Sequence, residues 1–287
     1  MKIGILGIPF NGDGTRPEIE NPASTLRKVG LSNLQKHIGG RVQDYGDLEI
    51  PVHEGIRDSR TKVLNLEAWK EVSRQTAIKL HSIQEETDFV IVLGGDCSIL
   101  LGIFGAFYLS KKRVGLISLD GHTDYRDPSS SSTGEPADLE LAILTGTGPN
   151  ELTGLFGPPP LLHSTDAVVC GFREPDLIAK SNIHRFDYSD FRKTGASILA
   201  NQTLTLLGHL DRLWFHFDVD VLDPTIMPVS FPEPDGLSID ATLEFLSTSI
   251  RSQKITGLSI ACYHPNLDPD LKAAAMIVEM INLALAF

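Results

Sequence analysis

The sequence predicts an α/β domain built around a mostly parallel central sheet, and three observations support this fold class. Short apolar runs alternate with helix-like patterns along the chain, as they do where each strand is followed by a crossover helix. Residues 89–93 are apolar at every position, which is typical of a parallel strand buried on both faces. Runs 114–119 and 213–217 each lead into aspartates, and ligands of parallel α/β sheets bind beyond such strand ends.

Each expected strand is a short apolar run bounded by Gly, Pro or polar residues. In chain order, the expected strands occupy residues 2–8, 42–45, 89–93, 114–119, 167–171, 213–217 and 255–261. Segments 9–21, 46–61 and 146–160 lack periodicity or are rich in Gly and Pro, and we expect loops there. Cys170 lies within an apolar run, which predicts a core position.

The expected helices lie between these strands and after the last one. They occupy residues 22–37, 67–86, 99–109, 139–144, 188–207, 239–251 and 271–286. Trp69, Val72, Leu80 and Ile83 form one apolar stripe on the second helix, and Pro22 suits the first turn of the first. The last helix is apolar on nearly every face, which predicts burial in the core or at a subunit contact.

Length and composition narrow the class of protein. We expect residues 1–287 to form a single α/β domain, since 287 residues suffice for one large hydrophobic core. A net charge of -12 argues against nucleic acid or an anionic membrane as a partner. Three cysteines are too few for a disulfide framework and indicate a reducing, cytoplasmic setting. No apolar stretch approaches a membrane span.

Three potential metal ligands follow the run 114–119. Asp120, His122 and Asp124 occupy alternate positions, and alternate side chains of an extended backbone project to the same side. Bringing such groups together at a strand end costs solvation free energy. A bound cation or a role in acid–base catalysis would account for that cost. A polar strand end leading into a loop would explain this stretch if it stood alone.

The pattern returns after the run 213–217, where Asp218 and Asp220 again occupy alternate positions. Hard divalent cations bind carboxylate oxygens at such strand ends. Together the two stretches offer four aspartates and one histidine, which is more negative charge than one divalent ion neutralises. The sequence therefore predicts a pair of metal ions.

Three segments carry a resemblance to a known family. Residues 94–98 read Gly-Gly-Asp-Cys-Ser, residues 120–124 read Asp-Gly-His-Thr-Asp, and residues 218–224 read Asp-Val-Asp-Val-Leu-Asp-Pro. In this order and spacing they resemble the signature motifs of the arginase (ureohydrolase) family, which includes agmatinases and formiminoglutamases. The likeness extends to residues 21–31, 44–48 and 171–174, and so covers nearly the whole chain.

The resemblance implies a three-layer α/β/α domain with two Mn²⁺ ions at the strand ends. A hydroxide bridging the ions would attack the guanidinium carbon of a small guanidino or amidino substrate and release urea or a related product. Homo-oligomers, either trimers or hexamers, are expected. Transferred to matching positions, the family's ligands are Asp120 and Asp218 bridging both ions, Asp124 and Cys97 completing one ion, and His122 and Asp220 completing the other. Asp124 would also orient the hydroxide as a catalytic residue.

The sequence departs from the family pattern at three positions. Cys97 replaces a histidine ligand, and its thiolate is softer than imidazole and less suited to manganese. Loop 132–138 lacks the family's proton-shuttle histidine, and Glu135 is the catalytic residue expected in its place. Cys262 stands where the family has a guanidinium-binding glutamate. The substrate-binding residues that the resemblance implies are Ser131, Thr133, Glu174, Asp176 and Cys262.

Alternative functions follow from these departures. The chain could hydrolyse a modified arginine such as N-hydroxyarginine at an altered metal site. It could instead be a catalytically impaired binding protein on the ureohydrolase fold. A third possibility is a one-metal or cysteine-dependent hydrolase in which Cys97, at the start of a helix, is the nucleophile. Retention of five costly ligands that are not cysteine favours the two-metal hydrolase.

Overall fold

The structure is a computed structural model that describes residues 1–13, 21–38, 40–51 and 54–286. Its strands are β1 (Lys2–Ile8), β2 (Arg41–Asp47), β3 (Phe89–Gly94), β4 (Gly115–Leu119), β5 (Ala167–Cys170), β6 (His184–Phe186), β7 (Leu213–Asp218) and β8 (Ile255–Ala261). Its α-helices are α1 (Pro22–Lys28), α2 (Gln35–Ile38), α3 (Leu66–Glu86), α4 (Leu100–Leu109), α5 (Glu140–Leu144), α6 (Asn150–Thr153), α7 (Tyr188–Thr194), α8 (Ala196–Leu206), α9 (Ile239–Ile250) and α10 (Lys272–Leu285).

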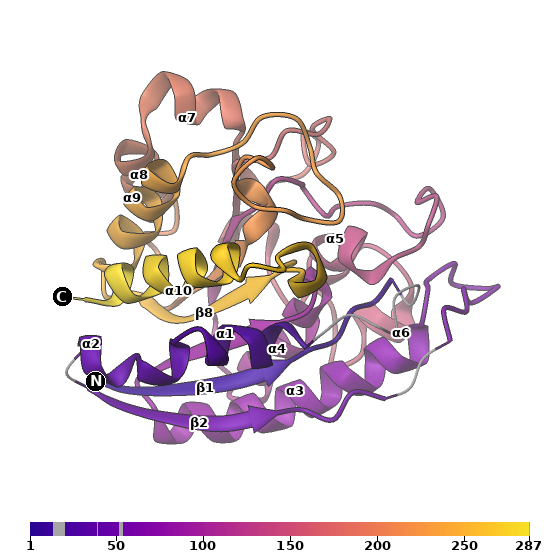
Figure 1. Cartoon of the computed structure of the whole chain (residues 1–287). Coiled ribbons are helices and arrows are strands. Elements are labelled where there is room, and N and C mark those ends of the chain that lie inside the picture. The colour runs from indigo at the N-terminus through magenta and orange to yellow at the C-terminus, as the bar shows by residue number, and fades with distance from the viewer. Residues whose placement is uncertain (14–20, 39, 52–53, 287) are drawn as a thin grey trace.

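The described strands form one eight-stranded sheet in the order β2-β1-β3-β8-β7-β4-β5-β6. Every neighbouring pair in it runs parallel, which confirms the predicted α/β class. Helices α1, α8, α9 and α10 pack on one face, and α3, α4 and α5 pack on the other (Figure 1). The carboxyl ends of all eight strands consequently lie along one edge of the sheet.

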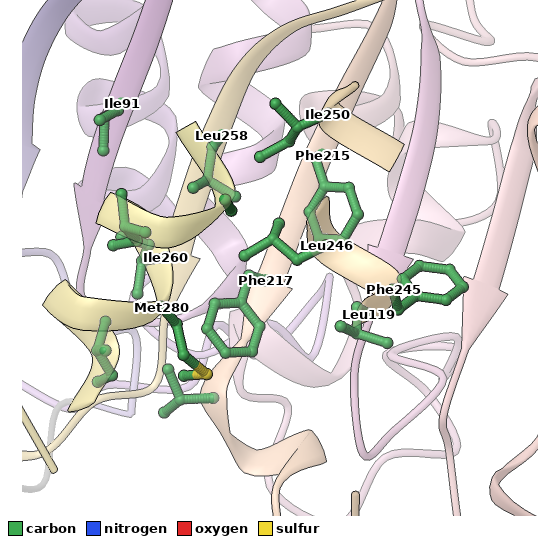
Figure 2. Close-up of a cluster of buried hydrophobic side chains, with 14 of the residues drawn as sticks. Ile91, Leu119, Phe215, Phe217, Phe245, Leu246, Ile250, Leu258, Ile260 and Met280 are labelled. Atoms are coloured by element: carbon green, nitrogen blue, oxygen red, sulfur yellow. The ribbon is translucent and has the colours of Figure 1, made fainter. Parts of the chain in front are cut away.

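The central strands are buried on both faces, so their side chains alternate between two cores. In β7, Phe215 and Phe217 pack with residues of α9 and α10, while Trp214 belongs to the core formed with α3 and α4. Figure 2 shows the first of these cores, with Phe245 of α9 and Met280 of α10 beside the strand side chains. The alternation places the even-numbered residues of β7 on the face covered by α3 and α4.

Replacing Phe245 with alanine is expected to lower the free energy of unfolding by about 3–5 kcal/mol, because it empties a large site in a close-packed core. The Phe245 ring is fully buried, and its centroid lies 5.3 Å from that of Phe191 and 6.1 Å from that of Phe215. Urea unfolding of both proteins measures the loss. Leu283→Ala on α10 is the control, because Leu283 is 49% exposed and its loss should cost less than about 0.5 kcal/mol. Similar losses for both variants would contradict this account of the core.

Two expected helices are interrupted at glycines. The helix expected at 22–37 is wrong in extent: α1 ends at Lys28, and a 3-10 turn (Leu31–Asn33) and α2 follow. Gly30 has a φ of 133°, which a side chain rarely tolerates and which ends the first helix. The helix expected at 188–207 divides into α7 and α8 at Gly195, where φ is 92°.

Other differences concern short or surface elements. β6 was not expected, because three residues at a sheet edge carry no readable periodicity. The loop expected at 146–160 contains the single turn of α6. α10 is not buried all round, since Ala275, Glu279 and Leu283 are exposed along one side of the helix. Residues 14–20 and 52–53, within two of the expected loops, lie outside the described residues.

Cys170 is completely buried, as predicted. No helix among the described residues has both the length and the apolar character needed to cross a membrane.

Candidate metal centre

The loop after β4 gathers three potential ligands. Donor atoms of Asp120, His122 and Asp124 all lie within 4.8 Å of one another. The Asp120 N–H donates to the Cys170 carbonyl oxygen of β5 at 2.9 Å, which fixes the start of the loop. Asp120 Oδ1 accepts the His122 N–H at 2.7 Å. The structure thus brings together three residues that alternate in the sequence.

The end of β7 adjoins this loop because β7 and β4 are neighbours in the sheet. Asp218 Oδ1 accepts the Asp220 N–H at 2.7 Å, at the start of a 3-10 turn (Val219–Val221). Asp220 Oδ1 accepts the Gly121 N–H at 2.9 Å, and Asp220 Oδ2 lies 2.9 Å from His122 Nδ1. These contacts hold the two motifs together.

Cys97 enters the same cluster from the turn after β3. A Cβ on the preceding Gly95 would lie 2.0 Å from the Phe10 carbonyl oxygen, so only glycine allows this close approach. The Cys97 thiol donates to Asp218 Oδ2 at 2.7 Å, and its Sγ lies 4.0 Å from Asp120 Oδ2. Cys97 is therefore placed among carboxylates, in a position from which it can bind a cation.

His216 joins this group although the sequence did not single it out as a ligand. Its Nε2 lies 3.2 Å from Cys97 Sγ, and one donor atom each of Cys97, Asp120, His216 and Asp218 lies within 4.8 Å of the others. The spacing carried a signal: residues 216, 218 and 220 alternate as Asp120, His122 and Asp124 do. Burial lowers the pKa of His216 to about 3, so its imidazole is neutral at physiological pH, the form that binds metals.

The carboxylates of the centre repel one another in a buried environment. Burial, followed by the charge of Asp220, raises the pKa of Asp120 to about 8. Burial and neighbouring carboxylates also raise the pKa of Asp124 and of Asp218 well above the usual range. Burial alone would lower the pKa of His122, but the hydrogen bond and charge of Asp220 outweigh it and raise that pKa to about 10. A cation would relieve this repulsion.

Glu140 is a further acid at the centre that the sequence analysis did not identify. It lies in the first turn of α5, is 2% exposed, and its charge interacts with that of Asp124. Burial, and then the charge of Asp120, raises the pKa of Glu140 well above its usual range. Within the described part of the chain its Oε2 has no hydrogen-bond partner. The available signal was a glutamate inside an otherwise apolar helix.

The expected substrate-binding acids are held by other side chains. Glu174 Oε1 accepts the backbone N–H of Thr123 at 2.8 Å, and Glu174 Oε2 pairs with Arg126 Nη2 at 3.0 Å. Asp176 pairs with Arg185 of β6, its Oδ2 lying 2.6 Å from Nε. Glu174 therefore braces the loop after β4 through Thr123, whereas Asp176 belongs to an ion pair at the sheet edge.

The loop that carries the expected substrate-binding residues Ser131 and Thr133 makes hydrogen bonds within itself. Ser131 Oγ and Thr133 Oγ1 lie 3.3 and 3.0 Å from Asp138 Oδ2. Glu135 is half-buried at the beginning of a 3-10 turn (Pro136–Asp138). Among the described residues, neither group of candidate metal ligands includes Glu135. Cys262, at the end of β8, has its Sγ 3.7 Å from Cys97 Sγ.

The donor set fits a pair of divalent ions. The two groups of ligands share Asp120, so a carboxylate of that residue lies between them. The group with His122 and Asp124 is rich in oxygen, which suits manganese, whereas the group with Cys97 and His216 adds sulfur and nitrogen, which suit softer ions.

Comparison with known proteins agrees with this geometry. The sequence pattern described as the Arginase family matches residues 1–286. Human arginase-1 is 29% identical over 297 aligned residues, covering 99% of this chain and 90% of that protein. The crystal structure of arginase from Bacillus cereus has a TM-score of 0.91 at 27% identity and covers 100% of this chain and 99% of that one. The arginase structure from Bacillus caldovelox has a TM-score of 0.92 at 25% identity, covering 99% and 98% of the two chains. This chain belongs to the arginase family, and its fold is that of the arginases.

Proposed function

We propose that this chain is a dinuclear metal-dependent hydrolase that cleaves a C–N bond of a small guanidino or amidino compound. The observation that carries the proposal is the pair of ligand groups sharing Asp120 at the carboxyl ends of β4 and β7. Family membership adds support, since relatives matched over nearly the full length are named arginases. Two divalent ions, with manganese expected from the family, would supply a water molecule acidic enough to act as a nucleophile near neutral pH.

The residues of the chain have separable roles in this proposal. Asp120 and Asp218 would hold both ions, and His122 and Asp220 would hold the second, with the imidazole oriented by its contact to Asp220 Oδ2 at 2.9 Å. Asp124 would accept a hydrogen bond from the attacking water and orient it. Glu140 would hold a proton beside Asp124, because burial, followed by the charge of Asp120, raises the pKa of Glu140 well above its usual range. We assign to Asp124 and Glu140 the transfer of a proton to the leaving nitrogen.

The substrate contacts favour a compound other than unmodified arginine. Glu174 is occupied by Thr123 and Arg126, so it is not free for the substrate's α-amino group. Cys262 cannot offer the charged pair that a glutamate gives a guanidinium group. We propose a guanidino or amidino substrate whose recognition depends less on charged contacts from the protein. Examples are an N-hydroxyguanidino compound and a formimino compound.

Ammonia and urea release across a panel of guanidino, N-hydroxyguanidino and formimino compounds tests the proposal. The purified protein, loaded with Mn²⁺ or Zn²⁺, is expected to turn over at least one compound, and chelation is expected to abolish the activity. Asp124→Asn should lower turnover by about 100-fold or more, as expected when an acid–base or orienting group is removed. Metal binding without turnover on any compound would contradict the hydrolase assignment.

A binding protein without catalysis is the second candidate, and the pair of thiols is the observation that favours it. Cys97 and Cys262 replace a histidine and a glutamate of the family pattern, and their Sγ atoms lie 3.7 Å apart. Calorimetric binding of a compound from this panel to the metal-loaded protein, with no product formed, would identify this function.

A further inference from the structure

His216 is an imidazole without a role in the proposed reaction, and it lies at the metal centre. We propose that His216 is a metal ligand which, with Cys97, Asp120 and Asp218, forms a site that prefers a zinc-like ion to manganese. The inference deepens the proposed function, on which it rests, by naming the ion of one position. In this site the imidazole comes from His216 on β7, two residues before Asp218, and the thiolate comes from Cys97 in the turn after β3.

The orientation of the imidazole supports this assignment. His216, Asp218 and Trp214 lie on the same face of β7, because side chains alternate along a strand. His216 Nδ1 lies 2.7 Å from Ser259 Oγ on the adjacent strand β8, where the two residues are in register. A serine oxygen can accept two hydrogen bonds, so Ser259 Oγ can take both this N–H and that of Trp214 Nε1, which lies at 2.9 Å. The Nε2 lone pair then points toward Cys97 and the carboxylates.

The spacing of the donor atoms suits tetrahedral coordination. With zinc–sulfur and zinc–nitrogen bonds of about 2.3 and 2.0 Å, ligand atoms on a tetrahedral ion lie roughly 3.5 Å apart. Cys97 Sγ lies 2.7 Å from Asp218 Oδ2, 3.2 Å from His216 Nε2 and 4.0 Å from Asp120 Oδ2. These separations bracket the tetrahedral value, and modest side-chain movement would equalise them.

The chemistry of the donors selects the ion. One thiolate, one imidazole and two carboxylates are the ligand types that zinc binds in proteins, whereas manganese favours oxygen donors. Binding requires the Cys97 thiol to lose its proton to solvent, so that the thiolate replaces the hydrogen bond to Asp218 with a bond to the ion. The neighbouring group of Asp120, His122 and Asp124 has no sulfur. The two positions therefore differ in the ions they prefer.

Titration of the metal-free protein with Zn²⁺, Mn²⁺ and Co²⁺ tests the inference without any substrate. Bound Co²⁺ is expected to show sulfur-to-cobalt charge-transfer absorption, which Cys97→Ser should abolish and the buried control Cys170→Ser should preserve. His216→Asn should weaken Zn²⁺ binding by more than about 10- to 100-fold, the range for loss of a residue that only orients a ligand, and should alter the visible cobalt spectrum. His81→Asn is the matched control, since His81 Nδ1 also lies 2.9 Å from a serine hydroxyl, that of Ser110.

Ser259→Ala provides a second, milder variant in case His216→Asn does not fold. It keeps the imidazole and removes only its orienting partner, so zinc affinity should fall by about 10- to 100-fold. Unchanged zinc affinity and cobalt spectra in the folded His216 and Ser259 variants would overturn the inference, as would equal affinity of the Cys97 position for manganese and zinc. These readouts are independent of catalysis: a His216-dependent zinc site without turnover would refute the proposed hydrolase and leave this inference standing.

Discussion

Replacing Asp218 with asparagine is expected to remove at least one bound ion and to lower kcat/KM by more than about 100-fold, because it affects a direct ligand rather than a supporting residue. Asp218 joins the turn after β3 to the end of β7. Its Oδ2 accepts a hydrogen bond from the Cys97 thiol at 2.7 Å, and its Oδ1 accepts one from the Asp220 N–H at 2.7 Å. The metal content of the dialysed variant and its turnover measure the two effects.

Stability measurements separate this effect from misfolding. Asparagine keeps the shape of the side chain, so the metal-free variant should still melt in a single cooperative transition. Saturating metal should raise the melting temperature of the variant less than that of the wild type, because the variant binds fewer ions. The exposed residue Asp240 provides the control Asp240→Asn, which should change neither quantity. Two equivalents of metal bound by Asp218→Asn at wild-type affinity would contradict the assignment.

The parallel fold and the two aspartate motifs were readable because both depend on local geometry. β3 is apolar throughout, β4 is fully buried and apolar apart from Ser118, and the two aspartate motifs come directly at the ends of β4 and β7. The helix breaks at Gly30 and Gly195 were missed, because apolar periodicity continues across them while positive φ angles end the helices.

The thiol–imidazole part of the centre depends on long-range strand order. Cys97 follows β3 and His216 lies on β7, and the two strands are separated in the sheet by β8. Ser259, which anchors His216, is placed by the register of β7 with β8. A histidine within an apolar run is more often a hydrogen-bonded core residue than a ligand, so only the folded chain indicates its role.

The same contacts argue against Cys97 as a metal-independent nucleophile. Burial, and then the hydrogen bond with Cys262, raises the pKa of the Cys97 thiol well above its ordinary value. A reactive cysteine needs the opposite shift, usually from a nearby cation. The adjacent His216 is neutral, because burial lowers its pKa to about 3. Without a metal ion, this pair therefore lacks the thiolate that nucleophilic catalysis requires.

Metal-free protein is expected to become less stable as the pH rises from about 6 to 8. A carboxyl group whose pKa is higher in the folded than in the unfolded state favours folding at low pH, and this advantage is lost as the pH rises toward the folded pKa. The pKa of Asp120 is raised by burial to about 8, and those of Asp124, Asp218 and Glu140 are raised well above their usual values. His122 acts in the same direction. Its charged form is stabilised in the folded state, where its pKa is about 10, and this contribution is lost as the pH rises from the unfolded pKa toward the folded one.

Within the candidate metal centre, Asp220 and His216 oppose this trend. Asp220 has a lowered pKa, but its contribution is lost only as the pH falls below about 4. His216 is neutral in the fold, so its contribution falls as the pH drops below the unfolded value of about 6.5. Between pH 6 and 8 the four carboxyl groups with raised pKa values and His122 outnumber these two groups. The stability of the metal-free protein is therefore expected to fall over this range.

The melting temperature of chelator-treated protein at pH 6, 7 and 8 measures the effect. One additional proton bound by the folded state changes stability by about 1.4 kcal/mol per pH unit, so a fall of at least about 3 °C is expected over this range. Glu140→Gln should reduce the slope, whereas Glu279→Gln on the exposed side of α10 should leave it unchanged. Saturating metal should abolish or reverse the trend, because metal ions compete with protons for the same ligands and bind more tightly as the pH rises. If the metal-free protein instead became more stable between pH 6 and 8, the carboxylates would not share a buried, uncompensated site.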